Sequence, residues 1–149
     1  MAKLIGIATH ETSRGPIIEH ETIKVTKESG LKNDYQGARR RSTQVTLLSQ
    51  KSWKTACKEA GTDLDWTARR ANLLIDDLEF NESMIGQQVQ IGNVLLEITR
   101  ETDPCPRMDD LHQGLKQALT PGWRGGARCK VLREGSVNIG DRIQLLARV

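Results

Sequence analysis

The chain has 149 residues, the size of a single domain, of which 37% are hydrophobic and 28% are charged. This balance supports one core and excludes a disordered tail, and no apolar run approaches the roughly 20 residues that span a bilayer. The net charge of +3 is mildly basic and only 3% of residues are aromatic, so nucleic acid is disfavoured as a partner. Three widely spaced cysteines and the lack of a signal peptide favour a cytoplasmic protein with reduced thiols, outside any membrane.

The first half of the chain predicts short strands and one helix. Apolar runs and polar–apolar alternation predict strands at 4–8, 17–26, 43–48 and 71–75, with a polar, basic loop at 27–42. A helix is predicted at 50–60, because Ser49 is a good N-cap and Gly61 suits the C-terminal cap.

The second half continues this pattern. Strands are predicted at 87–91 and 94–100, joined as a hairpin by Gly92 and Asn93, and at 127–133 and 141–147. Apolar residues at helical spacing predict a second helix at 106–118. The predicted fold is mainly β with two or more short helices, a β-barrel or half-barrel, in a single domain over residues 1–149.

Cys105 is the main candidate for chemistry. It lies between Pro104 and Pro106, which restrict the backbone on both sides. Pro106 suits the first position of the following helix, which would make Cys105 the N-cap, where the helix dipole and Arg107 favour a thiolate. Three carboxylates oppose this effect: those of Asp103, Asp109 and Asp110. The alternative is a buried structural cysteine.

The other candidate nucleophiles and ligands are weaker. Cys57 lies on the apolar stripe of the first helix, and Cys129 shares a strand face with apolar residues, so both are predicted in the core. No pair has C-x-x-C spacing, which disfavours a zinc site. His112 follows Cys105 by two helical turns, too far for a hydrogen bond to its sulfur, so we expect a core histidine.

Two arginine clusters are candidates for an anion site. Arg39, Arg40 and Arg41 lie in the loop before the third strand, and Arg69 and Arg70 lie before the fourth. Arginine binds phosphate through paired N–H donors, whereas a charge run alone is commonly a solvated surface. If one ligand joins the two clusters, they lie on one side of the fold, within reach of Cys105.

The order of several motifs resembles the MOSC domain, the C-terminal domain of molybdenum-cofactor sulfurases. The matching segments are 30–34, 41–48, 70–75, 102–105 and 135–141. The resemblance implies a β-barrel-type fold with a cysteine that carries a persulfide or ligates the molybdenum of a pterin cofactor. Cys105 takes the place of this cysteine, and Arg70 and Asn72 that of an Arg-x-Asn motif. The chain departs from the family at Asn33, where glycine is common, and in its longer approach to Gln44.

The leading hypothesis is therefore a sulfur-carrier or molybdenum-cofactor-binding module. The chain has no room for a pyridoxal-phosphate domain of its own, so a cysteine desulfurase or a molybdoenzyme would be its partner; whether it is an enzyme by itself stays open. The predicted site has Cys105 as catalytic residue and metal ligand, and a cofactor-binding set of Arg39, Arg40, Arg41, Arg70, Asn72 and Arg107. The alternative is a small β-barrel that binds RNA or another polyanion through these arginines, with Cys105 structural.

Overall fold

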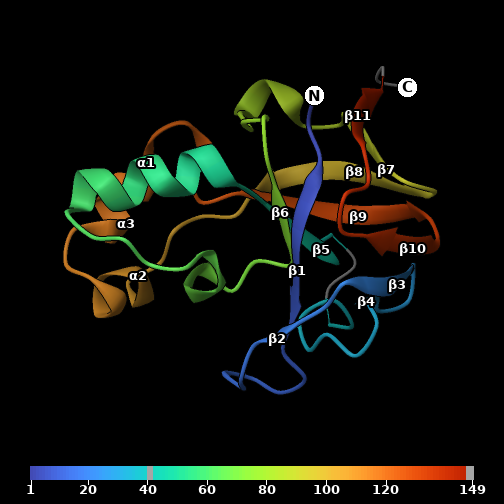
Figure 1. Cartoon of the computed structure of the whole chain (residues 1–149), viewed down its shortest axis with the longest axis horizontal. Helices are drawn as coiled ribbons and strands as arrows, with labels where there is room; N and C mark the ends of the chain where they lie inside the picture. Colours follow the sequence, from blue (N-terminus) through green and yellow to red (C-terminus); the bar gives the residue numbers. More distant parts are fainter. Residues whose placement is uncertain (40–41, 147–149) are drawn as a thin grey trace.

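Eight strands form one mixed sheet in the order β11-β7-β8-β9-β5-β6-β1-β2 (Figure 1). The computed structural model describes residues 1–39 and 42–146. The strands of this sheet are β1 (Leu4–Thr9), β2 (Ile18–Glu19), β5 (Val45–Ser49), β6 (Leu73–Ile75), β7 (Gln88–Ile91), β8 (Val94–Glu101), β9 (Ala127–Arg133) and β11 (Ile143–Leu146). β5 and β6 pair in parallel, and the other neighbours are antiparallel.

A three-stranded antiparallel sheet packs on one side of this larger sheet. It consists of β10 (Gly135–Asn138), β3 (Thr22–Thr26) and β4 (Gly30–Leu31). β3 alternates between exposed threonine or lysine and buried Ile23 and Val25, so one face of the strand is wet and the other enters the core. The main core contains these two residues together with apolar side chains of β1 and β5–β9, such as Leu47 and Leu96.

Helices cover the opposite side of the large sheet. α1 (Gln50–Ala60) lies beside α3 (Leu115–Leu119), and α2 (Arg107–Leu111) follows β8 (Figure 1). The predicted caps of α1 are confirmed: Ser49 accepts a hydrogen bond from the Ser52 amide at 3.2 Å, and Gly61 has a φ of 82°. Trp53 and Leu115 belong to a second apolar cluster between these helices and the sheet.

The prediction of one continuous helix at 106–118 is wrong. It is divided into α2 and α3, because His112 is extended and Gly114 has a φ of 92°. Three 3₁₀ turns complete the helical structure of the described residues: η1 (Trp66–Arg69), η2 (Glu82–Met84) and η3 (Pro121–Trp123). None of the helices in the described ranges is long and apolar enough to cross a membrane.

Two predicted strands also need correction. The strand predicted at 17–26 is two strands in different sheets, β2 and β3. The strand predicted at 71–75 begins at Leu73, after Arg70 ends η1 with a φ of 65°. The hairpin at Gly92 is confirmed, with Ile91 paired to Val94.

The mainly β fold is confirmed, but the barrel is not. An isolated antiparallel bridge joins Lys3 to Arg142, which brings the start of β1 beside the start of β11. Backbone hydrogen bonds flank this bridge, from the Leu4 amide to the Asp141 carbonyl at 2.8 Å and from the Ile143 amide to the Ala2 carbonyl at 3.0 Å. Within residues 1–39 and 42–146, however, no strand pairing between β1 and β11 closes the large sheet into a barrel.

Candidate functional site

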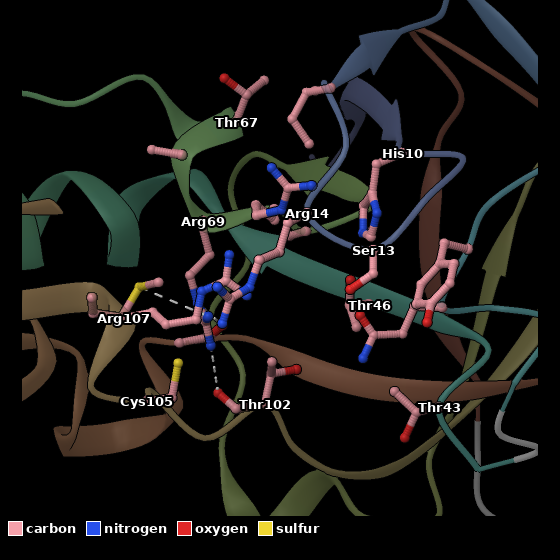
Figure 2. A pocket seen from close by; sticks show the side chains of 18 of the residues that line it. His10, Ser13, Arg14, Thr43, Thr46, Thr67, Arg69, Thr102, Cys105 and Arg107 are labelled. Carbon is pink, nitrogen blue, oxygen red and sulfur yellow. Dashed lines mark hydrogen bonds between the residues drawn. The ribbon is translucent and has the colours of Figure 1, made fainter. Parts of the chain in front are cut away.

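A cavity of about 730 Å³ opens between the loop after β1, η1, and the end of β8 with the segment that follows it (Figure 2). The sulfur-bearing side chain of Cys105 lines this cavity. Its cationic lining residues are Arg14, Arg39, Arg69, Arg70, Arg107 and Arg128. Within the described part of the chain, no aspartate or glutamate lines the cavity. Such a lining has the charge to bind an anion.

Cys105 is partly exposed in the segment between β8 and α2. The predicted N-cap position is wrong: α2 starts at Arg107, and Pro106 occupies the N-cap without a side-chain hydrogen bond. The Cys105 carbonyl oxygen accepts a bond from the Met108 amide at 2.9 Å, which makes a single turn at this point. α2 has only five residues, so a helix dipole is a weak source of positive charge for the sulfur.

The Arg69 side chain ties η1 to the backbone just before Cys105. Its side chain is 9% exposed; Nε donates to the Gly125 carbonyl at 3.1 Å, and Nη2 donates to the Thr102 carbonyl at 3.0 Å and to the Asp103 carbonyl at 3.4 Å. These bonds join η1 to both segments beside the sulfur. Burial lowers the pKa of Arg69, and the charge of Cys105 acts in the opposite direction, so the guanidinium and the sulfur lie within electrostatic range.

Gly125 makes this arrangement sterically feasible. A Cβ atom at this position would lie 2.6 Å from the Thr102 carbonyl oxygen and 3.1 Å from Nη2 of Arg69. A side chain would therefore displace the guanidinium from the carbonyls that hold it. The segment before β9 thus needs glycine here for its close approach to Arg69.

Arg70 and Arg107 are a pair of like charges at the cavity. Burial lowers the pKa of Arg70, and the positive charge of Arg107 lowers it further, whereas Asp34 acts in the opposite direction. Arg70 also donates from Nη2 to the Gly15 carbonyl at 2.6 Å, which ties η1 to the loop after β1. An anion bound between Arg70 and Arg107 would relieve their repulsion.

The far end of the cavity is formed by the loop that follows β4. Arg39 lies over the Tyr35 ring, with its guanidinium carbon 4.9 Å from the ring centre, and donates a hydrogen bond to the Tyr35 hydroxyl. Asp34 is buried and accepts bonds at 3.2 Å from the amides of His10 and Gly37. This carboxylate holds the loop against the end of β1 and so positions Arg39.

A family model described as MOSC domain matches residues 33–144. The chain belongs to the MOSC domain family. The resemblance found from the sequence is therefore confirmed. No protein among the curated sequences matches this MOSC domain.

Solved structures share the fold of this MOSC domain. The YuaD protein from Bacillus subtilis aligns with a TM-score of 0.78 and 18% identity over 96% of this chain and 94% of that one. YiiM from Geobacillus stearothermophilus aligns with a TM-score of 0.74 and 16% identity over 99% and 76% of the two chains. YiiM from Escherichia coli gives 0.73 and 17% over 99% and 71%. At identities this low, the structural similarity shows a shared fold and nothing about activity.

The structure brings most of the predicted site residues of the MOSC domain together. Cys105, Arg39, Arg70 and Arg107 all line the cavity, although they come from separate segments. Arg40 and Arg41 lie outside the described residues. The roles of these residues in binding stay predictions.

Asn72 does not line the cavity, and its amide is used inside the fold. Its Oδ1 accepts from the Thr46 amide at 3.0 Å, and its Nδ2 donates to the Ala8 carbonyl at 3.2 Å. The side chain therefore joins β5 to β1 where β6 begins. This placement favours a structural role over the predicted contact with a cofactor.

Sequence reasoning left several cavity residues unassigned, among them Arg14, Thr102 and Arg128. Arg128 had a usable signal, because it alternates with the buried Ala127 and Cys129 along β9 and so faces the other side of the sheet. The two others depend on how the loop after β1 and the end of β8 fold back, for which the sequence carries no periodic signal.

The remaining thiols and His112 are structural. Cys57 and Cys129 are buried, as predicted, and burial raises the pKa of both thiols. His112 is partly buried, and its Nε2 lies 2.9 Å from the Ala60 carbonyl oxygen, beside the end of α1. Among the described residues, no group of three or more His, Cys, Asp or Glu side chains is arranged to hold a metal ion. A metal at this site would need further ligands from a cofactor.

Proposed function

We propose that this MOSC domain binds a molybdenum–pterin cofactor in the arginine-lined cavity, with Cys105 as the thiolate ligand of the metal. The observation that carries the proposal is the combination of one partly exposed cysteine with six arginines and no carboxylate in the described lining. A phosphate-bearing pterin dithiolene needs cationic N–H donors for its phosphate and a soft ligand near its metal. The arginines and the Cys105 thiol of the cavity are donors of these two kinds, so the residues present fit the group.

The arginines would divide the binding between them. Arg70 and Arg107 repel each other at the cavity, so a phosphate dianion placed between them would stabilise both guanidinium groups. Arg39, held by Tyr35, supplies a further cation at the other end of the cavity. Arg69 has its donors committed to backbone carbonyls and acts by holding the Cys105 segment in place.

When bound, the molybdenum would supply two-electron redox chemistry next to the cysteine. The chain's own part is to present the Cys105 sulfur from a segment made stiff by Pro104 and Pro106 and by the Arg69 hydrogen bonds. The loop after β1, including Ser13 and Arg14, forms a further part of the wall of the cavity in which this sulfur lies.

The same cysteine could instead carry sulfur. A donor persulfide would transfer its outer sulfur to the Cys105 thiolate, leaving the donor as a thiolate and Cys105 as a persulfide. A cysteine desulfurase or a molybdoenzyme would then be the partner that supplies or receives this sulfur. The partial exposure of Cys105 is compatible with such an exchange.

The test is native mass spectrometry and molybdenum analysis of protein purified without reductant, under anaerobic conditions, from a host that makes the cofactor. The wild-type protein should retain near-stoichiometric pterin and molybdenum. Cys105→Ser should lose the molybdenum, and Arg70→Gln should lose the pterin. Arg142→Gln is the matched control, since Arg142 is exposed and does not line the cavity.

Other outcomes separate the remaining hypotheses. A mass increase of about 32 Da on Cys105, without pterin, would identify a sulfur carrier. Neither cofactor nor added sulfur, together with salt-dependent RNA binding that Cys105→Ser leaves unchanged, would refute both and favour a polyanion-binding protein.

A further inference from the structure

The Thr102 side chain has an unsatisfied hydroxyl beside the proposed ligand site. Its Oγ1 is buried and has no hydrogen-bond partner within the described part of the chain. The backbone of the same residue is fully bonded: its amide donates to the Gly126 carbonyl at 2.9 Å, and its carbonyl accepts from Nη2 of Arg69 at 3.0 Å. The backbone of Thr102 is therefore fixed by hydrogen bonds, while its side-chain hydroxyl makes none within the described residues.

An unpaired buried hydroxyl is a cost to the unliganded protein. Leaving such a group without a partner destabilises a fold, whereas a valine of nearly the same shape carries no such penalty. Other polar residues beside the cavity are bonded: the Thr67 hydroxyl donates to Asp65 at 2.5 Å, and the Thr46 hydroxyl donates to Asn72 at 3.2 Å. Thr102 differs from both, because its hydroxyl has no partner among the residues that the structure describes.

A buried positive charge lies next to this hydroxyl. The Arg69 guanidinium is bound to the Thr102 carbonyl, and it forms no ion pair within 4 Å with any carboxylate of the described residues. The charges of Cys105, Glu101 and Asp103 favour its cationic form, but burial acts more strongly against it. The charge is thus incompletely balanced, and an added anion would stabilise it.

Thr102 and Cys105 both line the cavity, and Figure 2 shows their side chains in the same part of it, below Arg69. The hydroxyl, the buried guanidinium and the sulfur are thereby grouped. A negatively charged oxygen of a ligand bound here would accept a hydrogen bond from the Thr102 hydroxyl. Its charge would also balance the positive charge of the Arg69 guanidinium.

We propose that Thr102 and Arg69 form a subsite for an oxyanion group of the substrate, such as a sulfo, phosphoryl or carboxylate group, next to the Cys105 sulfur. Thr102 donates the hydrogen bond, and Arg69 supplies the charge while it stays bound to the backbone. The inference deepens the proposed function and rests on it, because it assumes that the substrate reacts at the place where Cys105 holds the metal or carries sulfur. It requires no covalent step.

The test uses inorganic sulfate as the probe and the cofactor-free 149-residue chain, at constant ionic strength balanced with chloride. Calorimetric titration should show sulfate binding to the wild type and about tenfold weaker binding to Thr102→Val, the loss of one hydrogen bond. Thr102→Ser, which keeps the hydroxyl, should bind within about twofold of the wild type. Thr67→Val is the control and should bind like the wild type, because that hydroxyl already has a partner.

Two further readouts separate recognition from folding. The melting temperature of unliganded Thr102→Val should equal or exceed that of the wild type, since the variant removes an unsatisfied group. Sulfate should also slow the alkylation of Cys105 by iodoacetamide in the wild type, and do so less in Thr102→Val.

Equal sulfate affinity in the wild type and Thr102→Val, or no more stabilisation by sulfate than by chloride, would overturn the inference. Because this assay contains no cofactor, its failure is distinct from that of the proposed function. If sulfate binding depended on Thr102 while native mass spectrometry of the purified protein found no pterin, the subsite would be supported and the proposed cofactor binding would be refuted.

Discussion

Replacing the buried Arg69 with methionine should destabilise the domain more than any surface arginine would. Methionine keeps most of the length and apolar volume of the side chain and removes the guanidinium. The variant loses the bonds to the Gly125 and Thr102 carbonyls, at 3.1 and 3.0 Å, and the longer one to Asp103. Bonds from a charged donor contribute about 1.5–3 kcal/mol each, and the relief of a buried charge offsets part of their loss.

The expected net loss is about 3 kcal/mol in the free energy of unfolding. For 149 residues the entropy of unfolding is about 0.3 kcal/mol/K, so the melting temperature should fall by about 10 °C. Equilibrium unfolding in urea, followed by tryptophan fluorescence, measures the free energy directly. Cys105 should also become more mobile, because its segment loses its tie to η1.

Arg100→Met is the matched control. The Arg100 side chain is 57% exposed and lies 3.8 Å from an Asp103 carboxylate oxygen, a contact expected to contribute less than about 0.5 kcal/mol. If Arg69→Met destabilised the domain no more than Arg100→Met does, the buried hydrogen bonds of Arg69 would not hold the Cys105 segment, and the argument would be refuted.

Cys105 should react first with limiting iodoacetamide at neutral pH, because burial raises the pKa of the Cys57 and Cys129 thiols. Peptide mapping measures the order of labelling, and equal labelling of Cys57 would contradict the prediction. Asn72→Leu should lower the free energy of unfolding by about 2–3 kcal/mol, since it leaves the Thr46 amide in β5 unpaired; urea unfolding checks this, and a change below about 0.5 kcal/mol would argue against the structural role. Stability should fall above about pH 9, because thiols whose pKa is raised by folding lose their protons first in the unfolded chain. Cys129→Ala should reduce the slope of this loss between pH 9 and 11, and an unchanged slope would show that other groups cause it.

Local features of the fold could be predicted because their causes are local. The hairpin at Gly92 depends on a residue that tolerates positive φ between two alternating strands, and α1 depends on the caps at Ser49 and Gly61. The burial of Cys57 and Cys129 likewise follows from helical and strand periodicity. In each case the signal and the structure lie within a few residues of each other.

The errors arise where distant contacts override a periodic pattern. Residues 106–118 have helical spacing, yet Gly114 breaks the helix so that α3 can pack on α1 while α2 stays beside the Cys105 segment. The run 17–26 looks like one strand, but its two ends are paired in separate sheets. A one-dimensional pattern carries no information on which sheet edge is free to accept a strand.

By itself, the sequence determined the mainly β class and the MOSC family, because these depend on composition, turn residues and the order of motifs, and it singled out Cys105 as the candidate for chemistry. Only the tertiary structure decided what surrounds the sulfur. Arg14, Arg69 and Arg128 lie far apart along the chain, and they line one cavity with Cys105 because the loop after β1, η1, β8 and β9 converge there. Tertiary contacts also turned Asn72 away from the cavity, since its amide satisfies backbone groups of β1 and β5. Which side chains share a cavity follows from strand order and burial, and residue spacing cannot supply either.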